Sequence, residues 1–270
     1  MHNSVAEQIT ITEDFSAVTE LPSSQATKEQ MARLYQRYHL AATYSKQKRV
    51  LEIACGSGMG LGYLAQDAIS VTGGDCTESL LEFARSHYQN RVNLTWLDAH
   101  SLPFGSNQFE VALIFEAIYY MADVPKVLSE VRRILASQGT FIICTVNRDW
   151  NEFAPSPHSH KYYSVPELAS LLAQEGFTSI ETYGAFPVSN KQSLKSIITS
   201  LIRKIVIKFD LMPKTLEGRE KFKRLFYGGL IPMPAEISAA DFNQVEPLMP
   251  IPANQPTSNY KILYFIARCP

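Results

Sequence analysis

The chain has 270 residues, of which 46% are hydrophobic and 19% charged, so it can bury a complete core and has a globular composition. Its net charge of −1 argues against a protein that attracts nucleic acid through its overall charge. The four cysteines are scattered and form no CxxC pair, which indicates neither a zinc site nor a disulfide framework.

The N-terminus has no feature of an export signal. Residues 1–15 lack both a basic region and an apolar region, and no window holds the roughly 18 uncharged apolar residues of a transmembrane helix. We therefore expect a cytoplasmic protein without stable membrane insertion.

Helical and strand patterns alternate along most of the chain. Residues 1–24 are polar and lack periodicity, so we expect a flexible N-terminal arm there. Apolar residues at helical spacing predict helices at 25–44, 61–68, 77–90, 123–139 and 164–177. Apolar runs between turn residues predict strands at 49–55, 69–75, 92–98, 109–117, 140–146, 178–184 and 260–268.

Capping residues support the helix boundaries. Thr77, Asp123 and Ser164 stand at N-cap positions, and Gly139 stands where the helix over 123–139 would stop. Alternation of helices with apolar strands is typical of an α/β domain with a mainly parallel sheet.

One long segment interrupts this alternation. Residues 188–255 lie between the last two predicted strands and repeat neither pattern. We expect them to form an inserted helical lid that binds substrate, while 25–187 and 256–270 form the core.

A glycine-rich loop follows the first predicted strand in "VLEIACGSGMGLG". It contains Gly56, Gly58, Gly60 and Gly62. Glycines allow a ligand to approach the backbone closely, and the following helix offers free N–H groups. Such a loop can hold a nucleotide-like ligand at the edge of an α/β sheet, although a tight turn is the simpler alternative.

Acidic residues end the next two predicted strands. Asp75 lies 19 residues after Gly56, where a carboxylate can accept hydrogen bonds from ribose hydroxyls. Asp98, followed by Ala99, ends the third strand and can reach the amine of an adenine. Each acid has an alternative role in capping, but their order along the chain favours a nucleoside.

The loop does not fit a phosphate-containing ligand. Leu61 occupies the position of the third glycine of a dinucleotide fingerprint, and no Gly-Lys-Ser/Thr sequence follows. No lysine or arginine lies between Val50 and Leu81. These observations favour a ligand that contains adenosine but no phosphate.

Five segments together resemble the class I S-adenosylmethionine-dependent methyltransferases. They are "VLEIACGSGMG", "VTGGD", "LDAHSLPF", "FEVALIFEAIYYM" and "VLSEVRRILASQGTFII". The resemblance covers roughly residues 30–183 and the final strand. It implies a Rossmann-like, mainly parallel sheet of seven strands with helices on both faces and one antiparallel strand. It also implies S-adenosyl-L-methionine as the cofactor.

The resemblance assigns roles to individual residues. It places Glu52 near the methionyl group, Asp75 at the ribose, Asp98 at the adenine, and Phe115 and Glu116 beside the methyl group. Ala54 replaces a glycine that many members have, at a small expected cost. The cofactor-binding candidates are Tyr38, Glu52, Ala54, Cys55, Gly56, Gly58, Asp75, Cys76, Asp98, Ala99 and Phe115.

Several residues after the strands are candidates for a general base. Glu116 and Tyr119 follow the fourth strand, and His158 lies in the segment "PSPHSHKYY" after the fifth; these three are our catalytic candidates. Tyr120, His160 and His100 are alternatives in the same regions. No metal-binding pattern is visible, so we expect a metal-independent reaction.

Residues 191–224 form a basic part of the insertion. They contain ten Lys/Arg and three Asp/Glu, a net charge of +7. Ile198, Ile202, Ile205 and Phe209 share one helical face. This pattern is typical of a lid helix that packs over an active site, and also of contact with an anionic substrate or membrane surface.

These patterns favour an enzyme of small-molecule biosynthesis. We expect methyl transfer to a small-molecule acceptor, to oxygen rather than nitrogen, with an anionic sugar or secondary-metabolite intermediate as a candidate and no nucleic-acid partner. The alternatives are a nucleic-acid or protein methyltransferase and a non-catalytic regulator that binds S-adenosylmethionine. The sequence leaves the acceptor and the oligomeric state open.

Overall fold

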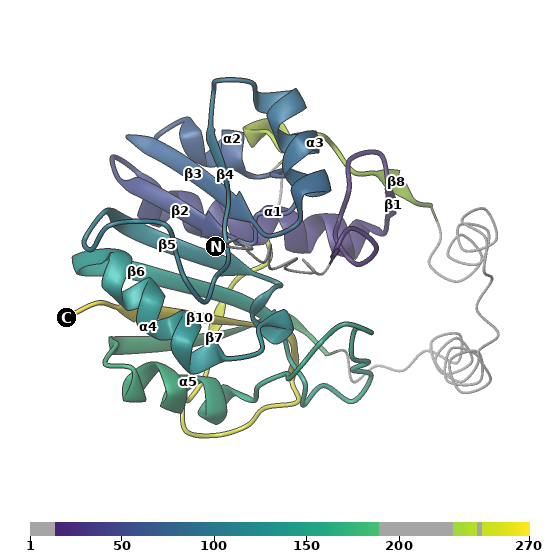
Figure 1. Cartoon of the computed structure of the whole chain (residues 1–270). Coiled ribbons are helices and arrows are strands. Elements are labelled where there is room, and N and C mark those ends of the chain that lie inside the picture. The colour runs from purple at the N-terminus through teal and green to yellow at the C-terminus, as the bar shows by residue number, and fades with distance from the viewer. Residues whose placement is uncertain (1–13, 189–228, 242–244) are drawn as a thin grey trace, which may run out of the picture.

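The computed structural model describes residues 14–188, 229–241 and 245–270. Figure 1 shows one twisted sheet covered by helices. Its eight strands follow the order β4-β3-β2-β5-β6-β10-β7-β9. Their bounds are β2 Arg49–Ile53, β3 Ser70–Asp75, β4 Asn93–Trp96, β5 Phe109–Phe115, β6 Leu135–Val146, β7 Thr178–Pro187, β9 Met249–Pro250 and β10 Tyr260–Arg268.

The predicted α/β fold with a mainly parallel sheet is confirmed. Strands β2 to β6 run parallel, and β10 lies antiparallel between β6 and β7. The seven predicted strands are all present, and the short β9 extends the edge at β7. The carboxyl ends of β2, β3, β4 and β5 therefore meet at one edge of the sheet, where ligands bind in folds of this class.

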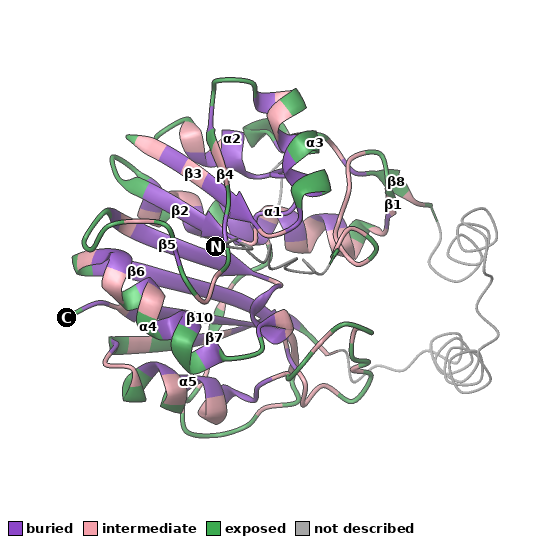
Figure 2. Ribbon diagram, viewed as in Figure 1, coloured by how far each residue is buried: buried purple, intermediate pink, exposed green. Residues whose placement is uncertain are grey.

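The helices cover both faces of the sheet. Their bounds are α1 Lys28–Ser45, α2 Leu61–Ala65, α3 Glu78–Tyr88, α4 Val124–Ile134 and α5 Val165–Gln174. One core packs α4 and α5 against one face of the sheet, and a second core packs α1, α2 and α3 against the other face. Alternate residues of the central strands belong to the two cores. The central strands are buried along most of their length (Figure 2). Among the described helices, none has the length and apolar character needed to cross a bilayer.

Two of the predicted caps form as expected. The Asp123 carboxylate accepts the Lys126 N–H at 3.1 Å, and the Ser164 N–H donates to the Glu167 carboxylate at 2.8 Å. Thr77 occupies the N-cap position of α3, but its side chain makes no cap hydrogen bond and instead accepts the Phe15 N–H at 3.3 Å. Residue 77 thus ties the N-terminal segment to the sheet edge.

The predicted end of the helix over 123–139 is wrong. Helix α4 ends at Ile134, and β6 begins with Leu135. Gln138 donates its N–H to the Cys269 carbonyl, and Cys269 donates back to Gly139. Pairing with the C-terminal segment therefore takes these residues into the sheet, and Gly139 does not serve as a helix stop.

The described part of the insertion crosses to the N-terminal half of the fold. Its strand β8, Ile231–Pro232, pairs with β1, Gln25–Ala26, and Ile237 donates its N–H to the Met59 carbonyl (Figure 1). A 3-10 turn, η2, covers Ala239–Asp241. The basic segment 191–224 lies outside the described residues, so its helical and lid character stays a prediction.

Candidate functional site

The glycine loop joins β2 to α2 and owes its shape to a few backbone positions. Gly58 has a φ of +77°, and Gly60 lies so close to the Tyr38 ring that an added Cβ would be 2.1 Å from it. The Tyr88 hydroxyl donates to the Gly58 carbonyl at 2.7 Å and accepts the Gly62 N–H at 3.1 Å. Packing of α1 and α3 thus fixes the loop.

Ala54 has a φ of +59°, in the left-handed region that disfavours residues with a Cβ. The small cost expected from the sequence is therefore wrong, because this conformation costs an alanine roughly 1–2 kcal/mol. We expect Ala54→Gly to raise the free energy of unfolding by about 1 kcal/mol, measured as a shift of the urea midpoint. Ala173→Gly, on the exposed face of α5, is the control and should destabilise the protein. A loss of stability in both variants would contradict the strain at Ala54.

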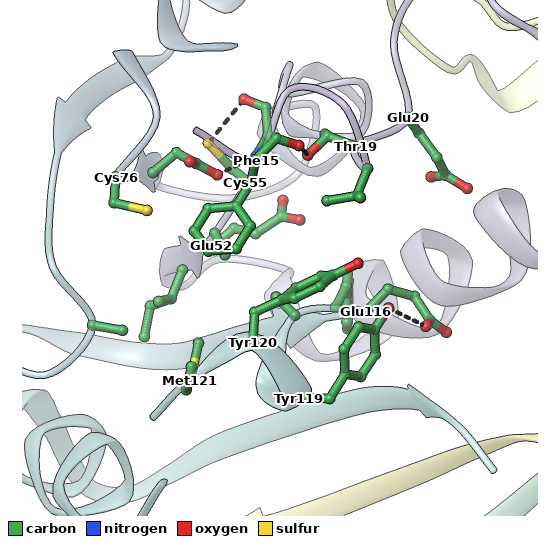
Figure 3. A pocket seen from close by; sticks show the side chains of 18 of the residues that line it. Phe15, Thr19, Glu20, Glu52, Cys55, Cys76, Glu116, Tyr119, Tyr120 and Met121 are labelled. Carbon is green, nitrogen blue, oxygen red and sulfur yellow. Dashed lines mark hydrogen bonds between the residues drawn. The ribbon is translucent and has the colours of Figure 1, made fainter. Parts of the chain in front are cut away.

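A cavity of about 620 Å³ lies at the carboxyl ends of the parallel strands (Figure 3). Most of the predicted site residues line it: Tyr38, Glu52, Ala54, Cys55, Gly56, Asp75, Cys76, Asp98, Ala99, Phe115, Glu116 and Tyr119. Gly58 does not line the cavity, and its left-handed backbone conformation shapes the loop. The volume falls within the range of small-molecule sites.

Asp75 holds the glycine loop against the end of β3. Its two carboxylate oxygens accept the N–H groups of Gly56 and Thr77, each at 2.8 Å. Burial raises the pKa of Asp75, although these hydrogen bonds favour its ionised form. Each oxygen retains a further lone pair for a ligand hydroxyl.

Glu52 places an unpaired carboxylate oxygen in the wall of the cavity. Its Oε1 accepts the Tyr38 hydroxyl at 2.7 Å, whereas Oε2 is buried and has no hydrogen-bond partner among the described residues. Burial raises the pKa of Glu52 to about 7, against the opposing effect of the Tyr38 hydrogen bond. A buried acceptor without a partner is costly, which marks this oxygen as a position for a ligand donor.

Asp98 and His100 form a hydrogen-bonded pair at the end of β4. The Asp98 carboxylate accepts the backbone N–H of His100 at 2.9 Å and lies 2.7 Å from its Nδ1. Partial burial opposes ionisation of Asp98, but these bonds hold its pKa below the ordinary value. His100 Nε2 accepts the Asp123 N–H at 3.3 Å. Both ring nitrogens are thus engaged, which disfavours His100 as a base.

Glu116 and Tyr119 lie together where β5 ends. The Tyr119 hydroxyl donates to Glu116 Oε2 at 3.1 Å (Figure 3). Glu116 has a φ of +52°, a strained conformation of the kind that clusters at functional sites. Burial raises the pKa of Glu116, although the nearby charges of Arg37 and Arg33 oppose this rise.

The comparisons with known proteins point to one family. The fold matches a crystal structure of an S-adenosylmethionine-dependent methyltransferase from Thermotoga maritima, with a TM-score of 0.54, 17% identity, and coverage of 90% of this chain and 98% of that one. Residues 51–143 match the family described as "Methyltransferase domain". Residues 51–143 therefore form a methyltransferase domain, and the fold is that of the S-adenosylmethionine-dependent methyltransferases.

Curated relatives share about half of this chain. A protein of Mycolicibacterium smegmatis named "Probable S-adenosylmethionine-dependent methyltransferase" is 31% identical over 143 residues, which cover 51% of this chain and 54% of that protein. The demethylmenaquinone methyltransferase of Tropheryma whipplei is 26% identical over 129 residues, 47% and 54% of the two chains. The chain thus spans about half the length of these curated relatives.

The charges around the cavity fit the family cofactor, S-adenosyl-L-methionine. Five acidic residues line the cavity, against two arginines: Glu20, Glu52, Asp75, Asp98 and Glu116, and Arg33 and Arg37. An acidic lining suits a ligand that carries an ammonium and a sulfonium group, and it repels phosphates. The free Oε2 of Glu52 supplies a buried acceptor for such an ammonium group.

The cavity also contains residues that the sequence did not reveal. Residues 14–24, predicted to belong to a flexible arm, contribute Phe15, Thr19 and Glu20 to the cavity wall. Thr19 Cγ2 lies 2.8 Å from the position of an added Cβ on Gly56, and Glu20 forms an ion pair with Arg37. No periodic pattern marks this segment, so only the long-range contacts identify it.

The catalytic role of His158 stays a prediction, although its ring packs edge-on against Phe15 of the cavity wall, with 6.4 Å between the ring centroids. His158 is exposed and does not line the cavity, whereas its neighbour His160 does. The His160 N–H donates to the Tyr119 carbonyl at 2.8 Å, which directs this residue toward the cavity. Two histidines separated by one residue in a loop cannot be distinguished without the loop's path.

The described residues contain no cluster of three His, Cys, Asp or Glu side chains that could hold a metal ion. A metal-independent reaction stays a prediction.

Proposed function

We propose that this protein transfers a methyl group from S-adenosyl-L-methionine to a hydroxyl group of a small-molecule acceptor. One observation carries the proposal: the unpaired Oε2 of Glu52 and the strained Glu116 line one cavity. The first suits binding of a cationic cofactor, and the second suits proton removal from an acceptor. The name of the demethylmenaquinone methyltransferase relative supports a small-molecule acceptor.

The cofactor would extend along the carboxyl ends of β2, β3 and β4. Glu52 and Tyr38 would hold the ammonium end of the methionyl group, and Asp75 would accept hydrogen bonds from the ribose. Asp98 and the backbone at Ala99 would meet the adenine edge. Trp96 donates its indole N–H to the Cys76 carbonyl at 2.8 Å, which fixes the wall on the adenine side.

Glu116 would act as the general base. When bound, the cofactor supplies an activated methyl group on a sulfonium, and its transfer leaves the bonding electron pair on sulfur. The Glu116 carboxylate takes the proton of the acceptor hydroxyl as the new oxygen–carbon bond forms. Tyr119 holds Glu116 through its 3.1 Å hydrogen bond, and the cavity walls orient the acceptor and limit water.

The acidic lining disfavours the nucleic-acid alternative. A phosphate backbone in the cavity would meet Glu20 and Glu116, with Arg33 and Arg37 as the arginines of the lining. We therefore retain the small-molecule acceptor as the proposal.

Calorimetric titration with S-adenosylhomocysteine tests the cofactor directly, with NAD as the control. We expect binding of S-adenosylhomocysteine in the micromolar range and none of NAD. Binding of NAD alone would overturn the proposal. A subsequent acceptor screen, in which S-adenosylhomocysteine formation is measured, separates an enzyme from a non-catalytic regulator.

A further inference from the structure

Two arginines of α1 lie one helical turn apart on the wall of the cavity. Both Arg33 and Arg37 belong to the lining, and the Nε atom of each is buried without a hydrogen-bond partner within the described part of the chain. A helix rises 1.5 Å per residue, so Arg33 lies about 6 Å further along α1 than Arg37. The cavity therefore offers two separate donor positions on this wall.

Arg37 is the more strongly neutralised of the two. Its side chain is only 9% exposed, and it forms an ion pair with Glu20. Arg37 directly precedes Tyr38, whose hydroxyl donates a hydrogen bond to Glu52. This position lies on the cofactor side of the cavity.

Arg33 shares its carboxylate partner with a second cation. Its ion-pair partner among the described residues is Glu29, one turn earlier on α1. Lys261 also binds Glu29, with 2.7 Å between its Nζ and the carboxylate. One carboxylate thus serves two cations, and Arg33 can neutralise a further anion through its free Nε–H.

Aromatic rings form the wall next to Glu116. Tyr120 packs against Phe15 with ring centroids 5.2 Å apart and against Tyr119 at 4.6 Å, so it lies between them (Figure 3). Tyr119 also stacks on Tyr162 at 4.2 Å, which restrains its ring. A flat aromatic ligand packs well against such a rigid wall.

We propose that Arg33 forms a subsite for a carboxylate of the acceptor, and that the acceptor is an aromatic hydroxy acid. This inference rests on the proposed methyl-transfer function. The ring lies against Tyr119 and Tyr120, the hydroxyl faces Glu116, and the carboxylate binds the guanidinium of Arg33. Arg33 and Glu116 line the same cavity, and the positive charge of Arg33 opposes the rise that burial causes in the pKa of Glu116.

The charge balance favours a carboxylate over a phosphate. A guanidinium group pairs with a carboxylate through two parallel hydrogen bonds. A phosphate dianion would bring two negative charges next to the carboxylates of Glu20, Glu29 and Glu116, whereas a carboxylate brings only one.

The test compares two probes that differ in one charge. Protein saturated with S-adenosylhomocysteine is titrated by calorimetry with 4-hydroxybenzoate and with its methyl ester. We expect the wild type to bind the acid at least about tenfold more tightly than the ester. Arg33→Gln should weaken acid binding about tenfold and leave ester binding unchanged, and Arg33→Lys should retain part of the preference.

Lys28→Gln is the matched control, because it removes one positive charge from an exposed position in the first turn of α1 outside the cavity. It should leave both affinities unchanged. Equal binding of acid and ester by the wild type, or binding of neither, would overturn the carboxylate subsite. A loss of S-adenosylhomocysteine affinity in Arg33→Gln would assign Arg33 to the cofactor instead. Failure of the wild type to bind S-adenosylhomocysteine would overturn the proposed function itself.

Discussion

Glu116→Gln is expected to lower kcat by about 10²- to 10⁴-fold, the usual contribution of a general base. The amide has nearly the same shape as the carboxylate and can still accept the Tyr119 hydroxyl, so the strained turn after β5 should persist. The amide cannot take a proton from the acceptor. Affinity for S-adenosylhomocysteine should therefore stay within a factor of about three, which is a change of less than 1 kcal/mol in binding free energy.

The pH dependence of turnover gives a second readout for Glu116. Burial raises the pKa of this carboxyl, so the wild-type rate should increase with pH through a value above the ordinary 4.5. The rate of Glu116→Gln should lack this increase. Tyr119→Phe serves as the matched control, because it removes one hydrogen bond and keeps the base. An unchanged kcat in Glu116→Gln would show that the acceptor loses its proton without this residue.

Local patterns were sufficient to predict the sheet and most of its carboxyl edge. The strand predicted at 260–268 has the same bounds as β10, because its apolar residues form one continuous buried run. Asp75 ends β3 and Asp98 follows β4 by two residues, and both strands are predicted by their short-range periodicity. Since parallel strands end at a common edge, this periodicity also placed the two acids on one cavity.

Contacts between distant segments account for the errors. The pairing of Gln138 with Cys269 joins residues 131 positions apart, and nothing near Gly139 indicates it. The placement of Glu20 depends on an ion pair with Arg37 in a helix that follows it. Ala54 has its left-handed conformation in the turn after β2, where the next residue, Cys55, donates its N–H to the Gly74 carbonyl of β3 at 3.0 Å. Each of these features follows from the assembled fold, which local propensity does not encode.

Glu52→Gln is expected to stabilise the empty protein at alkaline pH. Burial raises the pKa of Glu52 from its ordinary value of 4.5 to about 7, so the folded state holds a proton that the unfolded state releases between these values. The stability contributed by this group is therefore greatest below pH 4.5 and is lost as the pH rises through about 7. Glutamine stays neutral, and its variant should be more stable than the wild type at pH 8 by roughly 2–3 kcal/mol in the free energy of unfolding.

Urea unfolding at pH 5 and pH 8 measures this effect, and Glu110→Gln is its control. Glu110 lies near the amino end of β5, away from the cavity at the carboxyl ends of the strands. Its hydrogen bonds with Arg49 lower its pKa. Its contribution to stability therefore has the opposite sign with pH, and its partly exposed ion pair should make the effect small. Equal pH dependence in the wild type and Glu52→Gln would contradict the buried, protonated state of Glu52.

Cofactor binding should change in the opposite direction to stability. If Oε2 of Glu52 accepts a hydrogen bond from the ammonium group of the cofactor, its replacement by an amide nitrogen removes both the charge and the acceptor. We expect Glu52→Gln to weaken S-adenosylhomocysteine binding at pH 8 by about 10- to 100-fold, the usual cost of losing a charged hydrogen bond. The wild type should also bind more tightly at pH 8 than at pH 6, because more of its Glu52 is ionised. A variant that gains stability and keeps its affinity would show that Glu52 has no part in cofactor binding. A variant that gains stability and loses affinity would show that the Glu52 carboxylate binds the cofactor at a cost to the stability of the empty protein.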